Sequence, residues 1–536
     1  MFTFNNGTLK MNETDVEGYR DDPVTSDSIF RIMSVSKNVA LSSAFAVSNL
    51  RNQTGHLRLG LDTPLRMLLP EFSLPERDWN DGGSEITLGM LASHTAGVPR
   101  EVYSTGFNMI LSTSKGDGPT IGAEWASVTV QEVVSRISTT KLMFAPGQRA
   151  AYSNAGAALV GVAAAAYYNN MSNTSLSWSK IATEQVLKPL NMTHSFFGHI
   201  PQPLEAFIAI PGGSDNWADL LVGEGYNPTA GMWSSANDLS KYLHALWLSP
   251  SPSLVTKYQR RRSLKPAANL PDGVQQAAPG WEVYRLTLNT SANTSIDSAK
   301  TYSVYGKSGD GGGYHSWIDL IPNLGYGIVV LTQQSSTIAG YASLNPQNIR
   351  DIAHEILAPA FAKALAARAA ARFAGTYALG QQDTRLYADV VNTTTTTTTT
   401  GGSRANTTAT TTYARLEVKD QILYVRELVV NGTSALEALD RLSWSGNKGG
   451  PRLWSTEQGA MLVPSEGAAE HAEFGAGSQV FRAMFSDLPS CDWFDYDGLT
   501  DSRGWPLEKV VLVEEPDGGG TVELRYPPFD VVVRRG

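Results

Sequence analysis

The chain has a single cysteine, Cys491, among its 536 residues, and this scarcity excludes an intrachain disulfide. It has no apolar run near the roughly 20 residues that a membrane-spanning helix needs. Its eight histidines form neither an H-x-H nor an H-E-x-x-H pair, so no metal is implied. A G-x-S-x-G nucleophile elbow is missing as well. We therefore expect no metal or other cofactor, and the hydrolase chemistries that use these motifs fit poorly.

An excess of positive charge is also lacking, because 42 lysines and arginines stand against 51 aspartates and glutamates, for a net charge of -9. An acidic balance argues against nucleic acid or an anionic membrane as the main partner. We expect a small-molecule or peptide substrate instead. The length suggests two or three domains at a prior of roughly 150 residues each.

The stretch from Phe30 to Leu41 stands out because it places Ser34 and Lys37 three residues apart in a helix-compatible run. Side chains at this spacing share a helix face, so Lys37 is a candidate for the base that a serine nucleophile needs. For that role its pKa must fall toward neutrality, through partial burial or a neighbouring cation. The tetrapeptide alone is weak, since S-x-x-K also begins at Ser112, Ser138, Ser177 and Ser445.

Two further motifs follow this one in order along the chain. Tyr152-Ser153-Asn154 comes after a Phe-Ala-Pro-Gly segment, and Lys307-Ser308-Gly309 opens a glycine-rich stretch. The ordered set resembles the serine β-lactamase and penicillin-binding-protein superfamily, whose signature is S-x-x-K, then S-D-N or Y-x-N, then K-T-G. The tyrosine form is similar to class C β-lactamases, D-alanyl-D-alanine carboxypeptidases near them, and related esterases and acyltransferases. The likeness covers residues 1–372.

The resemblance implies that Ser34 is the acylated nucleophile and that Lys37 and Tyr152 exchange protons with it. Lys307 would supply a second cation whose field lowers the pKa of both Tyr152 and Lys37. The backbone N–H groups of Ser34 and Asp310 would form an oxyanion hole, in which each donor contributes on the order of 3 kcal/mol.

The remaining motif residues are implied to bind substrate. Asn154 would orient Lys37 and donate to a substrate carbonyl. Ser308, which precedes Gly309, occupies the position at which the family usually has threonine. This replacement should weaken recognition of a substrate carboxylate. The histidines His94 and His315 lie within family-like segments, and we interpret them as structural or rim residues.

The expected function is that of a β-lactamase-related serine hydrolase, acting on an ester or amide of a small molecule or peptide through a Ser34 acyl-enzyme. One alternative is a transesterase or acyltransferase of secondary metabolism, because the same residues would serve an alcohol acceptor. Another is a non-catalytic binding protein that keeps the β-lactamase fold. Oligomeric state and true β-lactamase activity are left open by the sequence.

The expected fold class is α+β, with a β-lactamase/transpeptidase-like antiparallel sheet flanked by helices in residues 1–372. A C-terminal all-β domain, barrel- or sandwich-like, should occupy residues 373–536, with its threonine-rich stretch 392–412 as a disordered loop. The elements expected around these features are strands at 281–288, 301–305, 314–321, 326–332, 414–418, 422–429 and 521–526, and a helix at 347–372.

Eleven asparagines lie in N-x-S/T sequons, against about five expected by chance in a Ser/Thr-rich chain. The excess favours a secreted, extracellular glycoprotein, with a cytoplasmic protein as the alternative. The N-terminus carries no signal-peptide pattern, and the resemblance implies a further helix before residue 1. We therefore expect a truncated N-terminal part and one undercovered face of the sheet.

Overall fold

The structure is a computed structural model in which the chain divides into two compact units, Met1–Ala358 and Pro359–Gly536. It describes residues 3–5, 8–10, 20–50, 59–73, 85–101, 128–211, 217–289, 299–333, 346–379, 411–419, 422–442, 459–465, 474–475, 477–484, 499–514 and 521–536. The predicted boundary after residue 372 lies within the second unit. Of the predicted disordered loop 392–412, residues 392–410 fall outside the described residues.

The first unit is built around helix α1 (Ser36–Ser48), whose thirteen residues are all buried. Its apolar residues, among them Val39, Leu41, Phe45 and Val47, belong to the main hydrophobic core. Six of the thirteen residues are polar, and burial requires hydrogen-bond partners for them. Asn38 Nδ2 donates to Gly280 O over 2.7 Å, and Trp178 Nε1 donates to Ser43 Oγ over 2.9 Å. These contacts fix the helix that carries Lys37.

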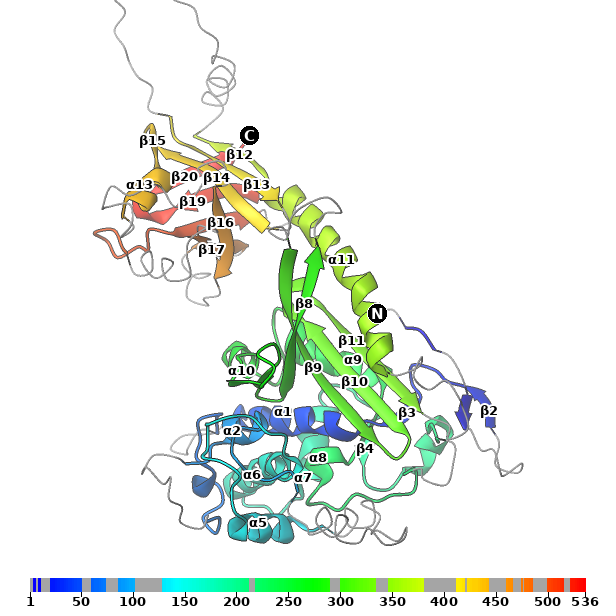
Figure 1. Cartoon of the computed structure of the whole chain (residues 1–536). Coiled ribbons are helices and arrows are strands. Elements are labelled where there is room, and N and C mark those ends of the chain that lie inside the picture. Colours follow the sequence, from blue (N-terminus) through cyan, green and yellow to red (C-terminus); the bar gives the residue numbers. More distant parts are fainter. Residues whose placement is uncertain are drawn as a thin grey trace, which may run out of the picture. The chain divides into compact units, whose positions relative to one another are not determined.

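A six-stranded antiparallel sheet with the order β11-β10-β9-β8-β7-β6 lies beside this helix (Figure 1). Its strands are β6 (Ala268–Asn269), β7 (Gln276–Ala278), β8 (Trp281–Asn289), β9 (Ala299–Gly311), β10 (Tyr314–Ile321) and β11 (Tyr326–Gln333). The last four contain the four strands predicted for this region. A smaller sheet joins β3 (Ile29–Arg31), β5 (Met232–Ser235) and β4 (Phe196–Phe197), and β1 (Thr8–Lys10) pairs with β2 (Arg20–Pro23).

Further helices surround α1 on the side away from the large sheet (Figure 1). They are α2 (Leu88–Ala92), α5 (Val130–Thr139), α6 (Asn154–Ser172), α7 (Trp178–Ala182) and α8 (Asn227–Ala230). Farther along the chain come α9 (Ala236–Tyr242) and α10 (Lys257–Ser263). The helix α5 begins with a complete capping box between Thr129 and Glu132, in which each side chain accepts from the other's backbone N–H.

The long helix α11 (Pro346–Phe373) begins in the first unit, where it packs on the sheet through a buried polar cluster. His354 Nε2 lies 2.9 Å from Asp319 Oδ2 on β10, and His354 Nδ1 lies 2.8 Å from the hydroxyl of Tyr326. Tyr284 also donates to Asp319, and the Arg350 guanidinium stacks over the Tyr284 ring. Burial raises the pKa of Asp319, against hydrogen bonds that lower it.

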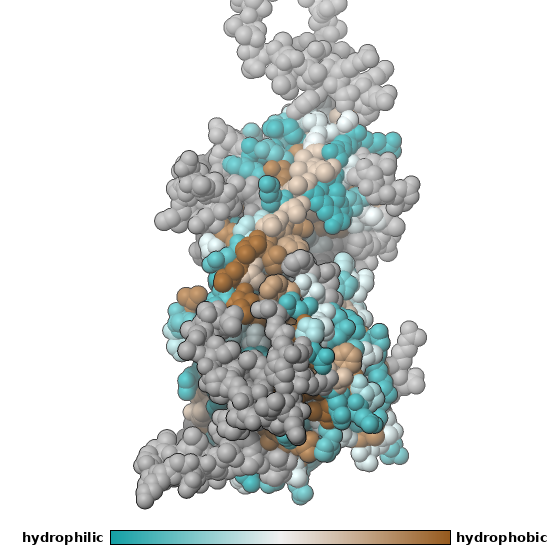
Figure 2. Space-filling view, turned by 90° about the vertical axis from the view of Figure 1, so that its right-hand side faces the viewer, coloured by the Kyte–Doolittle hydropathy of each residue, from teal (hydrophilic) through white to brown (hydrophobic). Residues whose placement is uncertain are grey.

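Apolar side chains are exposed on the outer side of α11. Ile352 is 54% exposed and Ile356 is 66% exposed, and hydrophobic surface gathers along this helix in Figure 2. On the sheet face below it, Trp317 and Ile328 are only half-buried. The expected undercovered face of the sheet is therefore partly covered by α11, which itself presents apolar surface.

The second unit contains a closed antiparallel barrel of eight strands, in which β13 pairs with both β12 and β14. Its strands are β12 (Gly375–Ala378), β13 (Tyr413–Lys419), β14 (Ile422–Val430), β16 (Ala460–Ser465), β17 (Ser478–Met484), β18 (Lys509–Glu514), β19 (Thr521–Tyr526) and β20 (Val531–Arg535). The short strand β15 (Thr433–Ser434) and helix α13 (Ala435–Leu442) follow β14. The predicted all-β domain is thus a barrel.

The described residues contain no helix long and apolar enough to cross a membrane. Among the same residues, no group of three or more histidine, cysteine, aspartate or glutamate side chains could hold a metal ion.

Candidate active site

The serine and lysine of the first motif meet at the start of α1. Ser34 lies in the one-turn 3-10 helix η2 (Met33–Val35), which runs directly into α1. Lys37 Nζ donates to Ser34 Oγ over 2.8 Å and to Thr229 O over 3.1 Å. Burial, and to a smaller extent the charge of Lys307, lowers the pKa of Lys37 to about 8. The amine is therefore available in its neutral form close to neutral pH.

Tyr152 joins Ser34 and Lys37 in a hydrogen-bonded group of three residues. Its hydroxyl donates to Ser34 Oγ over 2.7 Å. Lys37 Nζ and Lys307 Nζ lie 5.0 Å and 5.1 Å from the centre of its ring. Burial acts to raise the pKa of Tyr152, but the two ammonium charges outweigh it and lower the pKa. Lys37 and Tyr152, the two candidates for carrying the Ser34 proton, thus both have a lowered pKa.

The backbone around Tyr152 is held by the segment that contains His94. Ser153 caps α6 by accepting from Gly156 N–H over 2.8 Å, and its own N–H donates to His94 Nδ1 over 3.1 Å. The imidazole lies 4.6 Å from the Tyr152 ring, centre to centre. Burial and the nearby lysine charges lower the pKa of His94 to about 3. His94 is therefore a neutral acceptor that fixes the Tyr152 turn.

Asn154 does not make the contact predicted for it in this structure. Its Nδ2 donates to Glu101 Oε1, and the other oxygen of that carboxylate accepts from the Tyr226 hydroxyl over 2.9 Å. The buried Oδ1 of Asn154 has no hydrogen-bond partner among the described residues. Lys37 Nζ instead donates to the carbonyl oxygen of Thr229, and the Thr229 hydroxyl donates to Asn154 O over 2.9 Å. The orientation of Lys37 is thus set by Thr229.

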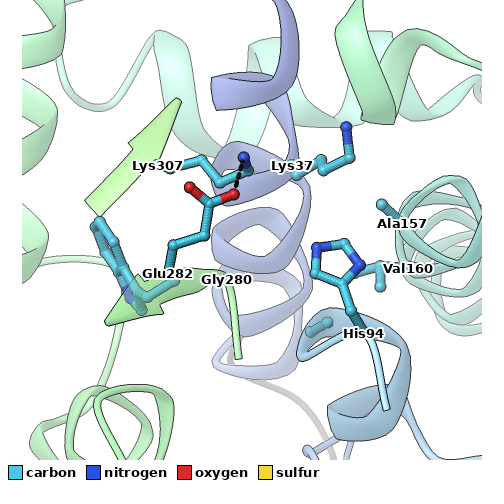
Figure 3. Close-up of a pocket in the computed structure, with 9 residues that line it drawn as sticks. Lys37, His94, Ala157, Val160, Gly280, Glu282 and Lys307 are labelled. Atoms are coloured by element: carbon cyan, nitrogen blue, oxygen red, sulfur yellow. Dashed lines mark hydrogen bonds and ion pairs between the residues drawn. The ribbon is translucent and has the colours of Figure 1, made fainter. Parts of the chain in front are cut away.

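Lys307 lies on β9 and is paired with a carboxylate from the neighbouring strand (Figure 3). Its Nζ lies 2.6 Å from Glu282 Oε1 and donates to Ser308 O over 2.8 Å. Burial acts to lower the pKa of Lys307, but the charge of Glu282 outweighs it and raises the pKa. A small cavity beside these groups is lined by Lys37, Ala92, His94, Ala157, Val160, Gly280, Trp281, Glu282 and Lys307.

Gly309 is where β9 passes closest to the nucleophile. A Cβ atom at this position would lie 2.8 Å from Ser34 N and closer still to Ile32 O, so only glycine fits. Next to it, Asp310 Oδ1 lies 2.7 Å from His315 Nδ1 across the β9–β10 pair. The third motif is therefore in contact with the backbone of the first.

The structure brings the three predicted motifs into one site, while the roles assigned to their residues stay predictions. Sequence reasoning missed the two carboxylates Glu101 and Glu282 and the carbonyl of Thr229. Glu101 lies two residues after the family-like segment that contains His94 and ends at Pro99, which was a usable signal. Glu282 is an ordinary charged residue in a strand, and only the strand pairing brings it next to Lys307.

Comparison with known proteins gives one consistent family. The family model described as Beta-lactamase matches residues 6–353. "Beta-lactamase-like protein 2" of Dictyostelium discoideum is 25% identical over 346 residues, which cover 64% of this chain and 55% of that protein. The D-alanyl-D-alanine-carboxypeptidase/endopeptidase AmpH of Escherichia coli K12 is 24% identical over 58% of this chain and 72% of its own.

A solved structure of a beta-lactamase/D-alanine carboxypeptidase from Yersinia pestis aligns at 16% identity with a TM-score of 0.45, covering 66% of this chain and 91% of that one. This chain spans about half the length of the Dictyostelium relative.

Proposed function

Since this chain belongs to the beta-lactamase family, we propose that it is a serine hydrolase that cleaves an ester or amide through an acyl-enzyme on Ser34. The single observation that carries the proposal is the joint hydrogen bonding of Ser34 Oγ with Lys37 Nζ at 2.8 Å and the Tyr152 hydroxyl at 2.7 Å. A serine hydroxyl with two titratable groups in contact, both with lowered pKa, has the activation that nucleophilic catalysis needs.

In the proposed reaction, Ser34 Oγ attacks the carbonyl carbon while its proton passes to Lys37 or Tyr152. The backbone N–H groups of Ser34 and Asp310 stabilise the negative charge on the carbonyl oxygen. The leaving group departs with a proton returned by the same pair, and water then attacks the acyl group to regenerate Ser34. The close passage of Gly309 against Ser34 N supports the placement of both donors at one carbonyl oxygen.

The test is covalent labelling with a fluorophosphonate, followed by mass spectrometry of the adduct. We expect the phosphonyl group on Ser34, no labelling of Ser34→Ala, and normal labelling of Ser138→Ala. Ser138 is the matched control because it also begins an S-x-x-K sequence, but its hydroxyl donates to Val134 O within α5. Labelling at another serine, or none at all in the wild type, would refute the proposed function.

We also propose that the protein is secreted and glycosylated. Among the sequon asparagines whose side chains the structure describes, Asn170, Asn173, Asn191 and Asn431 are all exposed. Their sites are accessible, which a glycan requires. After expression through a eukaryotic secretory pathway, peptide N-glycosidase should convert these asparagines to aspartate, detectable by mass spectrometry. Four unmodified asparagines under these conditions would refute the assignment.

A further inference from the structure

Acceptors of the protein itself occupy two of the three N–H donors of the Lys307 ammonium group. One donor reaches Glu282 Oε1 at 2.6 Å and another reaches Ser308 O at 2.8 Å. The Tyr152 ring, whose centre lies 5.1 Å from Nζ, occupies a further direction. The cation that would receive a substrate carboxylate is therefore already paired with a carboxylate of the protein itself.

The hydroxyl beside it is engaged in the same way. Ser308 Oγ lies 3.5 Å from Glu282 Oε2, so both carboxylate oxygens face the Lys307-Ser308 pair. The Lys307 side chain is only 3% exposed, whereas that of Glu282 is 38% exposed. The more accessible member of the ion pair is thus the negative one, and it borders the same cavity as Lys37.

We propose that Glu282 is a specificity-determining residue that directs this site to uncharged esters or amides and disfavours substrates with a carboxylate next to Lys307. The inference rests on the proposed acyl-enzyme function. A substrate carboxylate at this position would meet an existing carboxylate and would compete with it for Lys307, and like charges brought together at a binding site disfavour the wrong ligand.

Two matched pairs of esters test the proposal, because a substrate carboxylate could lie on either side of the ester carbonyl. The first pair is 3-carbamoylphenyl butyrate and 3-carboxyphenyl butyrate, which share an acyl group and differ in the charge of the leaving group. The second pair is phenyl glutaramate and the phenyl monoester of glutarate, which place the charge on the acyl side. The measured quantity is the ratio of kcat/KM for the neutral ester to that for the anionic ester.

We expect the wild type to favour the neutral member of each pair by about tenfold or more. Glu282→Gln should lower this ratio by about tenfold in at least one pair, chiefly because the anionic ester gains, since Lys307 is then unpaired. Glu282→Asp keeps the charge and should keep the discrimination. Glu71→Gln removes one exposed carboxylate elsewhere in the first unit and is the control for net charge.

The proposal is overturned if the wild type prefers the anionic esters, or if Glu282→Gln leaves both ratios within twofold of the wild type. Fluorophosphonate labelling of Ser34 shows in each variant that the site is assembled. If Glu282→Gln does not label, Glu282→Ser, which leaves room for water, takes its place. Absence of turnover together with absence of any Ser34 adduct in the wild type would refute the proposed function itself, a result distinct from unaltered selectivity.

Discussion

At the scale of single residues, the site depends on charges that are held close together and away from water. The neutral amine of Lys37 requires burial, and burial is also what lowers the pKa of His94. Glu282 has the opposite effect on Lys307: it raises the pKa, because an ammonium paired with a carboxylate keeps its proton. The pKa of Lys37 is thereby lowered to about 8, while Lys307 stays a fixed positive charge next to Tyr152.

The lowered pKa of Lys37 predicts how acylation depends on pH. A lysine with a pKa of about 8 is protonated below that pH and cannot accept the Ser34 proton, so the acylation rate should rise with pH and level off above about 8. Stopped-flow acylation by a neutral ester from about pH 6 to about pH 10 measures this. Lys37→Arg, which stays protonated throughout, should be slower by at least about a hundredfold. A flat wild-type profile would contradict the assignment.

The close contact at Gly309 gives a second prediction. Gly309→Ala would push β9 away from Ser34 N, and displacement of one oxyanion donor should lower kcat by about 10² to 10³. The matched control is Gly60→Ala, because a Cβ at Gly60 would meet nothing closer than Thr63 Oγ1 at 4.0 Å. Ester hydrolysis by the two variants, at equal folded fraction by circular dichroism, is the measurement. Equal activity would show that β9 does not supply a donor.

Individual residues also show what a sequence can reveal. Ser34, Lys37 and Tyr152 were identifiable because their spacing and order are chemically constrained. Glu282 was not, since its partner lies 25 positions away and the strand register alone aligns them. Some of the sequon asparagines also have a conformational role that the sequence could not reveal. Asn173, Asn191 and Asn431 have φ values of 52°, 53° and 50°, a left-handed conformation that asparagine tolerates well.

At the scale of elements, local signals were predictable and tertiary ones were not. The capping box at Thr129 marked the start of α5 because both hydrogen bonds lie within four residues. Strand β10 was likewise predictable from its aromatic and β-branched residues. Its burial was not, because the polar Ser316 is buried while the neighbouring Trp317 is only half-buried. The short strands β6 and β7 carry no such signal. Strand β7 is defined by its pairing with β8, and β6 by its pairing with β7.

The contact of α11 with the sheet gives a prediction about stability. His354→Leu removes a hydrogen-bond partner of Asp319, whose carboxyl is fully buried, and should cost about 3 kcal/mol of unfolding free energy. Ile356→Gln, two residues further along α11 and on its exposed side, should change it by no more than about 0.5 kcal/mol. Urea unfolding followed by tryptophan fluorescence compares the two. Similar losses in both variants would contradict an anchoring role for His354.

At the scale of the whole molecule, the hydrophobic cores are separate. The clusters of the first unit draw on α1, α6, α9 and the six-stranded sheet. The cluster of the second unit draws on the barrel strands, α13 and the end of α11. The β-rich character of the second unit was predictable from the change in composition, although this unit begins at Pro359 and not after residue 372. The closure of the barrel was not, because it depends on the single pairing of β13 with β14.

Separate cores predict that each unit can be weakened without loss of the other. Leu512→Ala on β18 empties a fully buried position of the barrel and should cost about 2 to 5 kcal/mol there. Differential scanning calorimetry of the full chain should show one transition shifted down, while fluorophosphonate labelling of Ser34 at 25 °C keeps its wild-type rate. Leu239→Ala on α9 is the reciprocal variant, because Leu239 is equally buried in the first unit. It should lower the other transition, and a single transition that moves in both variants would show that the two units unfold as one.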